Sequence, residues 1–397
     1  MQPRSKGAIM SSKIGGDSDS ITRRELFGAA SLAAAGLTVW GAAKATTAAA
    51  QRAPGKHEPL EGFKYDIEAS EGWVGEAGSA KEANVSEFPV SKSMAGVSMR
   101  LKPGGLRELH WHAVAAEWAY VIEGNVRTTV IAPNGQAESS DFGPGDVWYF
   151  PKGHGHALQC LGPGDAHFVL VFDSGYYSEF GTFSITDWVA HTPTAVAARN
   201  LGLPESVVAN LPKQELYITP GKVPPPMPEA FRNGDPEENQ FPHKFRLGAS
   251  KPMIFPGGEQ RIVSSVEFPI QKTVTGVVQE LKPGALRELH WHPNADEWKY
   301  YLSGKSRVTI FGAHGRVATE EFKPGQVAFI QQGFGHFVGQ VGDETTRILI
   351  VFNSPVYEEI SISGWLAANP PSMLADNFKL TPGQVARLPK AAQGILG

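Results

Sequence analysis

Two sets of residues with the same types and spacing stand out as possible metal ligands. The sets are His110, His112, Glu117 and His156 in the first half, and His290, His292, Glu297 and His336 in the second. Residues i and i+2 of a strand point to one face, so each His-x-His pair should face the interior of a barrel. The glutamate follows a short turn, so its carboxylate can reach the same point in the interior. The last histidine comes from a strand that pairs with the strand of the His-x-His pair. This convergence predicts a metal site in each half rather than two buried, hydrogen-bonded histidines.

The ligand types narrow the choice of metal. Three imidazoles and one carboxylate leave two adjacent positions of an octahedron open, which suits Mn(II) or Fe(II) better than structural zinc. The residues alone do not separate these two metals. The chain has one cysteine, Cys160, which excludes a cysteine-based zinc site and an intramolecular disulfide and is expected to be a small buried apolar residue.

Self-comparison indicates the elements that must position these side chains. Residues 88–124 match residues 268–304 at an offset of 180, so the chain contains one domain twice. Short apolar or alternating runs, separated by Gly/Pro turns, predict strands at 97–101, 117–124, 126–132, 147–151 and 167–172. The fold class is therefore all-β with appended helices: two tandem jelly-roll barrels, each followed by a helical tail, at 186–201 and 363–378.

Composition and the N-terminal residues indicate which partners and which cellular location to expect. With 36 basic and 40 acidic residues among 397, the net charge of −4 argues against a nucleic-acid partner. Arg23 and Arg24 precede an uncharged stretch at 27–43, which is typical of a twin-arginine export signal. We expect cleavage near Ala50, a periplasmic or extracellular protein, and no stable membrane insertion afterwards. The predicted segments are an export signal at 1–50, a leader at 51–60, an N-terminal domain at 61–212, a Pro-rich linker at 213–242 and a C-terminal domain at 243–397.

Arg107 and Arg287 stand three residues before the first histidine of each set, in the same run LRELHWH. A guanidinium beside a metal with open positions would serve as a fork for a substrate carboxylate. The odd spacing puts the arginine on the opposite face of a regular strand, so this interpretation requires a local irregularity.

Both halves resemble the cupin family in its two sequence motifs, which in the first half run from Gly104 to Gly124 and from Gly145 to His156. The runs RELHWH and GDVWYFPKGHGHALQ, and the segment around 172–193, resemble bacterial bicupin oxalate decarboxylases over the mature chain. The resemblance implies Mn(II), two per chain, held by the two residue sets above, with dioxygen as co-catalyst. It also implies oxalate as substrate, Arg107 as the substrate fork, and a homo-oligomer, a trimer or hexamer.

The first half has 15 residues between Phe172 and Trp188, whereas the second has 12 between Phe352 and Trp365. The longer segment resembles the lid of these decarboxylases, which implies that Glu179 is the acid/base that accepts a proton and returns it to carbon. Oxalate would then yield formate and CO2, mainly at the N-terminal site. We expect the second half to lack a lid glutamate and to be no independent catalyst.

Three alternatives remain at this point. The first is an oxalate oxidase, in which the same site would deliver no proton to carbon and would yield CO2 and hydrogen peroxide. Phe180-Gly181, which stands in the lid in place of the Asn-Ser of the family, favours this alternative. A storage-type bicupin is disfavoured because both ligand sets are intact. A metal-dependent dioxygenase acting on another small acid is the third.

Overall fold

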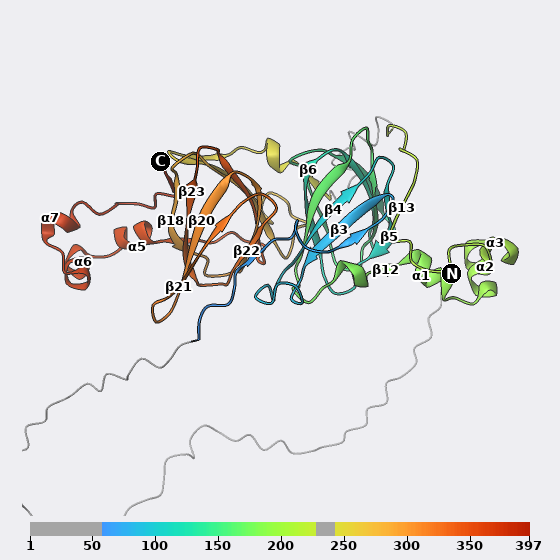
Figure 1. The fold of residues 1–397 in the computed structure, drawn as a ribbon, viewed down its shortest axis with the longest axis horizontal. Helices are drawn as coiled ribbons and strands as arrows, with labels where there is room; N and C mark the ends of the chain where they lie inside the picture. The colour runs from blue at the N-terminus through green and yellow to red at the C-terminus, as the bar shows by residue number, and fades with distance from the viewer. Residues whose placement is uncertain (1–57, 228–242) are drawn as a thin grey trace, which may run out of the picture. The chain divides into compact units, whose positions relative to one another are not determined.

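The computed structural model describes residues 58–227 and 243–397. The predicted export signal, most of the leader and the second part of the linker lie outside the described residues. Within the described part of the chain, no helix is long and apolar enough to cross a membrane. From residue 58 the chain forms two similar halves (Figure 1).

The first half forms two β-sheets that enclose a core. One sheet has the order β14-β9-β6-β11-β4-β3-β2, and the other has the order β12-β5-β10-β7-β8 with β13 paired to β5. The strands are β2 (Trp73–Val74), β3 (Gly78–Ala83), β4 (Ala95–Leu101), β5 (Leu106–Trp111), β6 (Glu117–Glu123), β7 (Val126–Ile131), β8 (Ala137–Phe142), β9 (Val147–Phe150), β10 (Gly155–Cys160), β11 (Ala166–Phe172), β12 (Phe183–Ser184) and β13 (Ile218–Thr219).

The second half repeats this arrangement. Its sheets have the orders β1-β22-β19-β24-β17-β16-β15 and β21-β20-β23-β18-β25, with β26 paired to β18. The strands are β15 (Met253–Phe255), β16 (Gly258–Val263), β17 (Thr275–Leu281), β18 (Leu286–Trp291), β19 (Glu297–Ser303), β20 (Lys305–Gly312), β21 (Arg316–Phe322), β22 (Val327–Ile330), β23 (Gly335–Val341), β24 (Thr346–Phe352), β25 (Ile360–Ser361) and β26 (Ile395–Leu396). The predicted pair of jelly rolls is confirmed.

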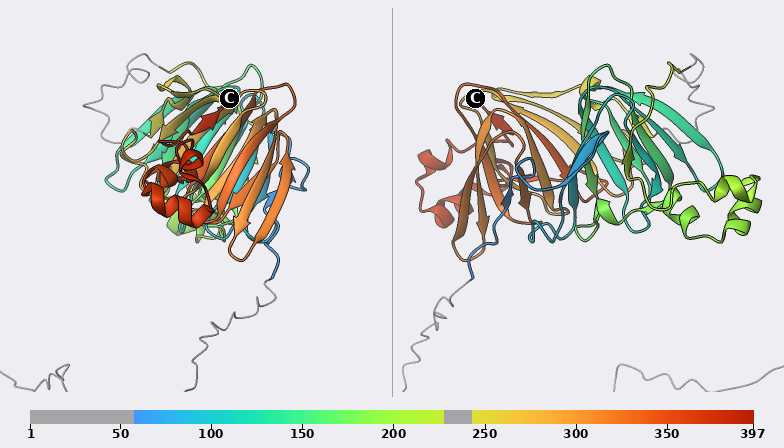
Figure 2. Two further views of the ribbon diagram at one scale, coloured as in Figure 1. Left: turned by 90° about the vertical axis from the view of Figure 1, so that its left-hand side faces the viewer. Right: turned by 45° about the vertical axis from the view of Figure 1, so that its right-hand side comes forward.

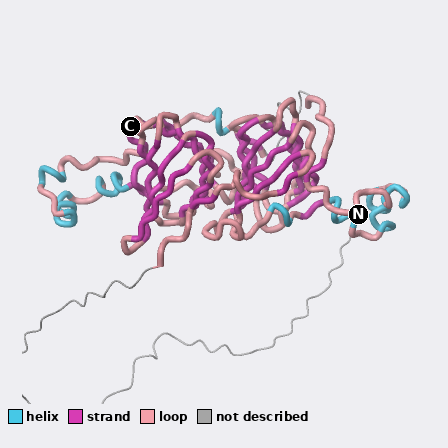
Figure 3. The backbone as a smooth tube through the Cα atoms, in the orientation of Figure 1, coloured by secondary structure: helices cyan, strands magenta, loops and turns pink. Residues whose placement is uncertain are grey.

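A short helical tail follows each jelly roll, as the sequence predicts (Figures 2 and 3). The tail of the first half contains α1 (Ile185–Ala190), α2 (Thr194–Leu201) and α3 (Glu205–Val208), and the tail of the second contains α5 (Ile362–Ala367), α6 (Pro371–Phe378) and α7 (Pro382–Val385). Two short 3-10 helices lie outside the tails, η1 (Glu179–Gly181) after β11 and η2 (Leu247–Ala249) before β15. Serine caps start the first helix of each tail: Ser184 accepts a hydrogen bond from the Asp187 amide, and Ser361 from the Gly364 amide.

The two halves exchange edge strands. Strand β1 (Lys64–Tyr65), from the start of the first half, pairs with β22 of the second. Strand β14 (Lys244–Phe245), from the start of the second half, pairs with β9 of the first. The predicted boundaries at residues 61 and 243 divide the sequence, but they do not divide the sheets. A two-residue strand gains backbone hydrogen bonds only where a free sheet edge is available, and here the partner half supplies that edge.

The predicted linker also contains structure. Strand β13, which begins one residue after Tyr217, pairs with β5 beside Arg107. We assigned residues 213–242 to a linker because they are rich in proline and polar residues, and residues 218–219 within it form a strand. Backbone pairing with an interior strand outweighs the local composition at this point.

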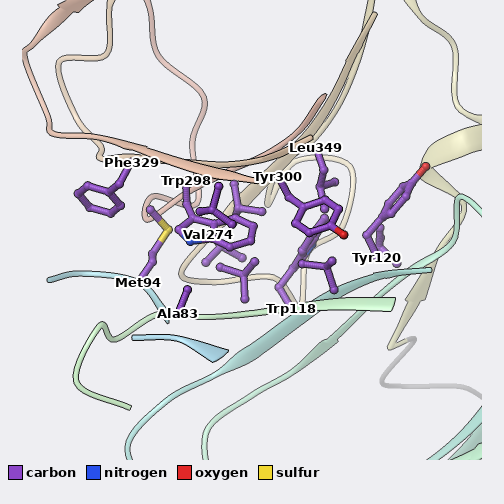
Figure 4. Close-up of a cluster of buried hydrophobic side chains, with 14 of the residues drawn as sticks. Ala83, Met94, Trp118, Tyr120, Val274, Trp298, Tyr300, Phe329 and Leu349 are labelled. Atoms are coloured by element: carbon purple, nitrogen blue, oxygen red, sulfur yellow. The ribbon is translucent and has the colours of Figure 1, made fainter. Parts of the chain in front are cut away.

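A shared apolar core lies between the two jelly rolls (Figure 4). Trp118 from β6 and Trp298 from β19 are both fully buried in it. Each indole packs over a glycine of the other half: Trp298 lies against Gly96, and Trp118 lies against Gly276. A Cβ atom on either glycine would overlap the facing indole ring. These contacts need the absence of a side chain on the neighbouring strand.

We predict that Gly96→Ala and Gly276→Ala each lower the free energy of unfolding by about 1–3 kcal/mol, because overpacking displaces a buried indole. Gly339→Ala is the matched control, since this strand glycine has no heavy atom within 4 Å of the added Cβ. Chemical denaturation of the three variants measures the effect. Equal stabilities for all three would contradict the proposed role of the two glycines.

Candidate metal centre

Strand β5 carries a β-bulge that brings Arg107 to the same side as His110. Opposite β5, His110 pairs with His156 and Arg107 pairs with Leu158. Three steps on β5 therefore face two steps on β10, which places one extra residue between the arginine and the histidine. Both side chains are buried, with exposed fractions of 0% and 2%. The irregularity that the odd spacing required is present, and β18 repeats it between Arg287 and His290.

In the first half the structure brings together all four predicted ligand residues. One ligand atom from each of His110, His112, Glu117 and His156 lies within 4.8 Å of the others, and all four side chains are buried. The His112 Nε2 atom lies 2.8 Å from Glu117 Oε2 and 3.1 Å from His156 Nε2. A cluster of nitrogen and oxygen donors at this spacing, enclosed by protein, fits a metal ion of the Mn(II) or Fe(II) type.

Hydrogen bonds orient the imidazoles so that one nitrogen of each is free for the metal. The Nδ1 atoms of His110 and His156 donate to the backbone carbonyls of Glu108 and His154, at 2.5 and 2.9 Å. Each of these rings therefore presents an unprotonated Nε2. The Glu108 carboxylate accepts the amides of Leu216 and Tyr217, both at 2.7 Å, which ties this turn of β5 to the segment before β13.

The charge states of the cluster suit metal binding. Burial holds the pKa of His110 well below its usual value, and neighbouring Arg107 lowers it further. Burial also lowers the pKa of His112. For Glu117, burial would raise the pKa, but His156 and His112 hold it well below its usual range. Neutral imidazoles and an ionised carboxylate are the forms that coordinate a metal.

The second half gathers its histidines in the same way. Ligand atoms of His290, His292 and His336 lie within 4.8 Å of one another. The Glu297 Oε2 atom lies 2.9 Å from His336 Nε2 and 3.6 Å from His292 Nε2. Among the residues that the structure describes, the buried atoms His292 Nε2, His336 Nε2 and Glu297 Oε2 form no hydrogen bond of acceptable geometry, despite their close approach. Buried donor atoms left without partners and directed toward one another fit a metal ion.

Comparisons with known proteins agree with this geometry. The cupin family model matches residues 71–209 and 246–386. The chain is 40% identical over 324 residues to an oxalate decarboxylase of Bacillus subtilis, covering 82% of this chain and 84% of that protein. It is 32% identical over 360 residues to an oxalate decarboxylase of Arthroderma benhamiae, covering 84% of each.

Solved structures give the same result. A structure of the Bacillus subtilis enzyme, determined in work on its Mn(II) centres, matches with a TM-score of 0.81 and 38% identity, over 86% of this chain and 90% of that one. The chain is a bicupin of the oxalate decarboxylase family. The bicupin has two His/Glu groups for Mn(II), one in each half.

In the N-terminal half of this bicupin, the lid segment closes on Arg107. The Arg107 Nε atom donates to Glu179 Oε1 at 2.9 Å, and Nη2 donates to Thr182 Oγ1 at 2.6 Å. The guanidinium also lies over the Tyr217 ring, 4.2 Å from its centroid. Glu179 is only 1% exposed. The structure therefore places the predicted acid/base and the predicted fork in direct contact, with solvent excluded.

Tyr177 links the lid to the metal cluster, and our sequence analysis did not identify it. Its hydroxyl hydrogen-bonds to Nδ1 of His112 and lies 3.3 Å from Glu179 Oε2. With His112 Nδ1 as donor to the phenol oxygen, the hydroxyl proton points to Glu179. A predicted metal ligand is thus connected to the lid carboxylate through one phenol. Its position two residues before Glu179 was the available signal.

The expectation that the second half lacks a lid glutamate is wrong. Glu359 forms an ion pair with Arg287 and accepts a hydrogen bond from the Tyr357 hydroxyl at 2.5 Å. Tyr357 and Glu359 lie 180 positions after Tyr177 and Glu179, so the offset continues through the lid. The three extra residues of the first half are therefore Phe180 to Thr182, which follow the glutamate. They lie within the longer segment between Phe172 and Trp188 that the sequence comparison identified.

Glu82, on β3, holds the lid from behind. Its carboxylate accepts hydrogen bonds from the Glu179 amide at 3.0 Å and from Ser178 Oγ at 2.9 Å. Asn84 Nδ2 donates to the same group at 3.0 Å. Burial raises the pKa of Glu82 to about 7, although the bonds from Ser178 and Glu179 oppose the shift. Opening of the lid would return this carboxyl to water and to a pKa near its ordinary value, about 4.3.

We predict that the lid closes more tightly at acidic pH. Because the pKa of Glu82 is higher in the closed state than in the open state, protonation of Glu82 stabilises the closed lid. This stabilisation is complete below the pKa of the open state and is lost as the pH rises through about 7. Hydrogen exchange of residues 174–184, corrected for intrinsic rates, should show protection falling by up to about tenfold per pH unit between pH 5 and 7. In Glu82→Gln this pH dependence should disappear. Its persistence in the variant would assign it to another group.

Proposed function

We propose that this bicupin converts oxalate to formate and CO2, mainly at the N-terminal centre. The observation that carries the proposal is the buried contact between Glu179 and Arg107 beside the His/Glu cluster. A predicted metal centre, a guanidinium and a carboxylate acid/base are thus grouped in one buried part of the first half. The relatives named oxalate decarboxylase support the same assignment.

The metal would be held by His110, His112, Glu117 and His156 in the first half and by His290, His292, Glu297 and His336 in the second. When bound, Mn(II) supplies Lewis-acid and, with dioxygen, one-electron chemistry toward a coordinated carboxylate. Arg107 balances the charge of the substrate carboxylate; Arg287 is its counterpart in the second half. Both guanidinium groups are buried, with exposed fractions of 0% and 3%, so their charge acts without screening by water.

Glu179 handles the proton. Hydrogen oxalate gives up its carboxyl proton to the Glu179 carboxylate, the carbon–carbon bond breaks, and CO2 leaves. Glu179 then returns the proton to the carbon of the remaining one-carbon unit, which gives formate with no net oxidation. General acid–base groups placed in this way typically contribute about 10²–10⁴-fold to rate. Tyr177 orients the carboxylate, and the closed lid excludes water that would compete for the proton.

Oxalate oxidation to CO2 and hydrogen peroxide is the second candidate. It is favoured by Phe180 and Gly181, where Phe180 is 41% exposed and carries no hydrogen-bonding side chain. A lid that opens readily would leave the one-carbon unit without its proton donor. The closed arrangement around Glu179 and Glu82 favours the decarboxylase.

Export and assembly are part of the same proposal. The paired arginines at 23–24 support export by the twin-arginine route to the periplasm or beyond the cell. Exposed apolar side chains on the helical tails support a homo-oligomer, a trimer or hexamer, in which they are covered; among them are Trp188, Leu201, Trp365, Met373 and Phe378. Small-angle scattering of the mature protein measures the assembly.

The test of the reaction is to incubate Mn(II)-loaded protein with oxalate in air at mildly acidic pH and to measure formate and peroxide together. We expect about one formate per oxalate consumed and little peroxide, because Glu179 delivers the proton to carbon. Peroxide without formate would establish the oxidase instead. If neither formate nor peroxide forms, both proposed reactions are wrong.

We predict that Glu179→Gln reduces formate production by about 10²-fold or more, since the amide cannot carry the proton. The Mn(II) content should not change, because Glu179 is outside the His/Glu cluster. Glu359→Gln is the matched comparison in the second half and should retain most of the formate production. Equal losses in the two variants would contradict the assignment of the reaction mainly to the N-terminal centre.

A further inference from the structure

The two metal centres differ in one cross-strand pair that lies behind the carboxylate ligand. In the first half Ala119 on β6 faces Trp148 on β9. At the corresponding positions of the second half, Lys299 on β19 faces Ala328 on β22. The large side chain of the pair is therefore on β9 in the first half and on β19 in the second, and it is an indole in the first half and an amine in the second. Both large side chains are buried, with exposed fractions of 0% for Trp148 and 1% for Lys299.

This exchange changes the partner of the metal-binding carboxylate. Trp148 Nε1, an uncharged donor, donates to Glu117 Oε1 at 2.7 Å, and Oε2 stays among the histidines. Lys299 Nζ lies 3.2 Å from Glu297 Oε1, and both side chains are at most 3% exposed. Glu117 shares a cluster of ligand atoms, all within 4.8 Å, with its three histidines. In the second half Glu297 Oε2 likewise lies 2.9 Å from His336 Nε2 and 3.6 Å from His292 Nε2, so the difference between the halves is the partner of the other carboxylate oxygen.

The same exchange changes the charge around the ion. The donor set of the first half carries one negative charge, from Glu117. In the second half the ammonium of Lys299 cancels the charge of Glu297, and a divalent ion there would also face a buried cation nearby. In an enclosed site such repulsion is only weakly screened, so it opposes binding of the ion.

We propose that Lys299 is a positioning residue that weakens the C-terminal metal centre relative to the N-terminal one. It does so by engaging Glu297 and by adding a positive charge beside the ion. At limiting metal the N-terminal centre fills first, and the C-terminal centre fills only at higher concentration. This inference concerns the two metal sites and does not depend on the oxalate reaction.

Equilibrium dialysis with Mn(II), with free ion measured by its EPR signal, tests the proposal without using turnover. The full chain is studied with one centre disabled at a time. His110→Ala/His112→Ala leaves the C-terminal centre, and His290→Ala/His292→Ala leaves the N-terminal centre. We expect the C-terminal dissociation constant to be at least about tenfold larger, a typical effect of a residue behind a metal ligand. Equal constants, or tighter binding at the C-terminal centre, would overturn the proposal.

Lys299→Gln and Lys299→Met, in the background that keeps only the C-terminal centre, should each tighten binding by about tenfold. Lys305→Gln is the matched control, because it removes the same charge from an exposed position on β20 and should leave the constant unchanged. Thermal unfolding of each variant without metal confirms that it is folded. Unchanged or weaker binding in the two folded Lys299 variants would overturn the proposal.

Discussion

The site depends on the strand β5 and on what pairs with it. Its pairing with β10 sets His110 opposite His156, and its bulge turns Arg107 to the same side. The strand also pairs with β12, which ends the lid, and with β13, which follows Tyr217. Two metal ligands, the guanidinium, the end of the lid and the segment that follows Tyr217 are therefore all registered against the six residues of this strand. A shift of one residue in this strand would turn each of these side chains to the wrong face.

Duplication preserved this strand and let its surroundings diverge. The run LRELHWH, the bulge and the carbonyl that orients the first histidine occur in both halves. The differences lie in the groups that contact the ligands. Tyr177 bonds to His112, whereas His292 donates to the Glu358 carbonyl at 2.7 Å. Two centres with the same ligands can thus differ in affinity and proton handling without any change in the ligands.

The sequence was sufficient for features that depend on local spacing. Alternation along a strand placed His110 and His112 on one face, and the internal repeat gave the two jelly rolls. It was not sufficient for features set by distant backbone. The bulge at Arg107 depends on pairing with β10, and the role of Glu82 depends on β3 lying behind the lid. Nothing in the residues around 64 or 244 indicates that the halves exchange edge strands, because each strand is only two residues long.

The closed lid explains how substrate and lid can be coupled. Each nitrogen of the Arg107 guanidinium donates one hydrogen bond: Nε to Glu179, Nη2 to Thr182 and Nη1 to the Tyr217 carbonyl at 3.4 Å, with Glu215 Oε1 3.9 Å away from Nη1. Removing Glu179 alone would leave a buried cation with too little compensating charge, which is strongly unfavourable. In the proposed reaction, a substrate carboxylate would supply that charge when Glu179 leaves Arg107. The buried charge that holds the lid closed would then be the one that recognises the substrate.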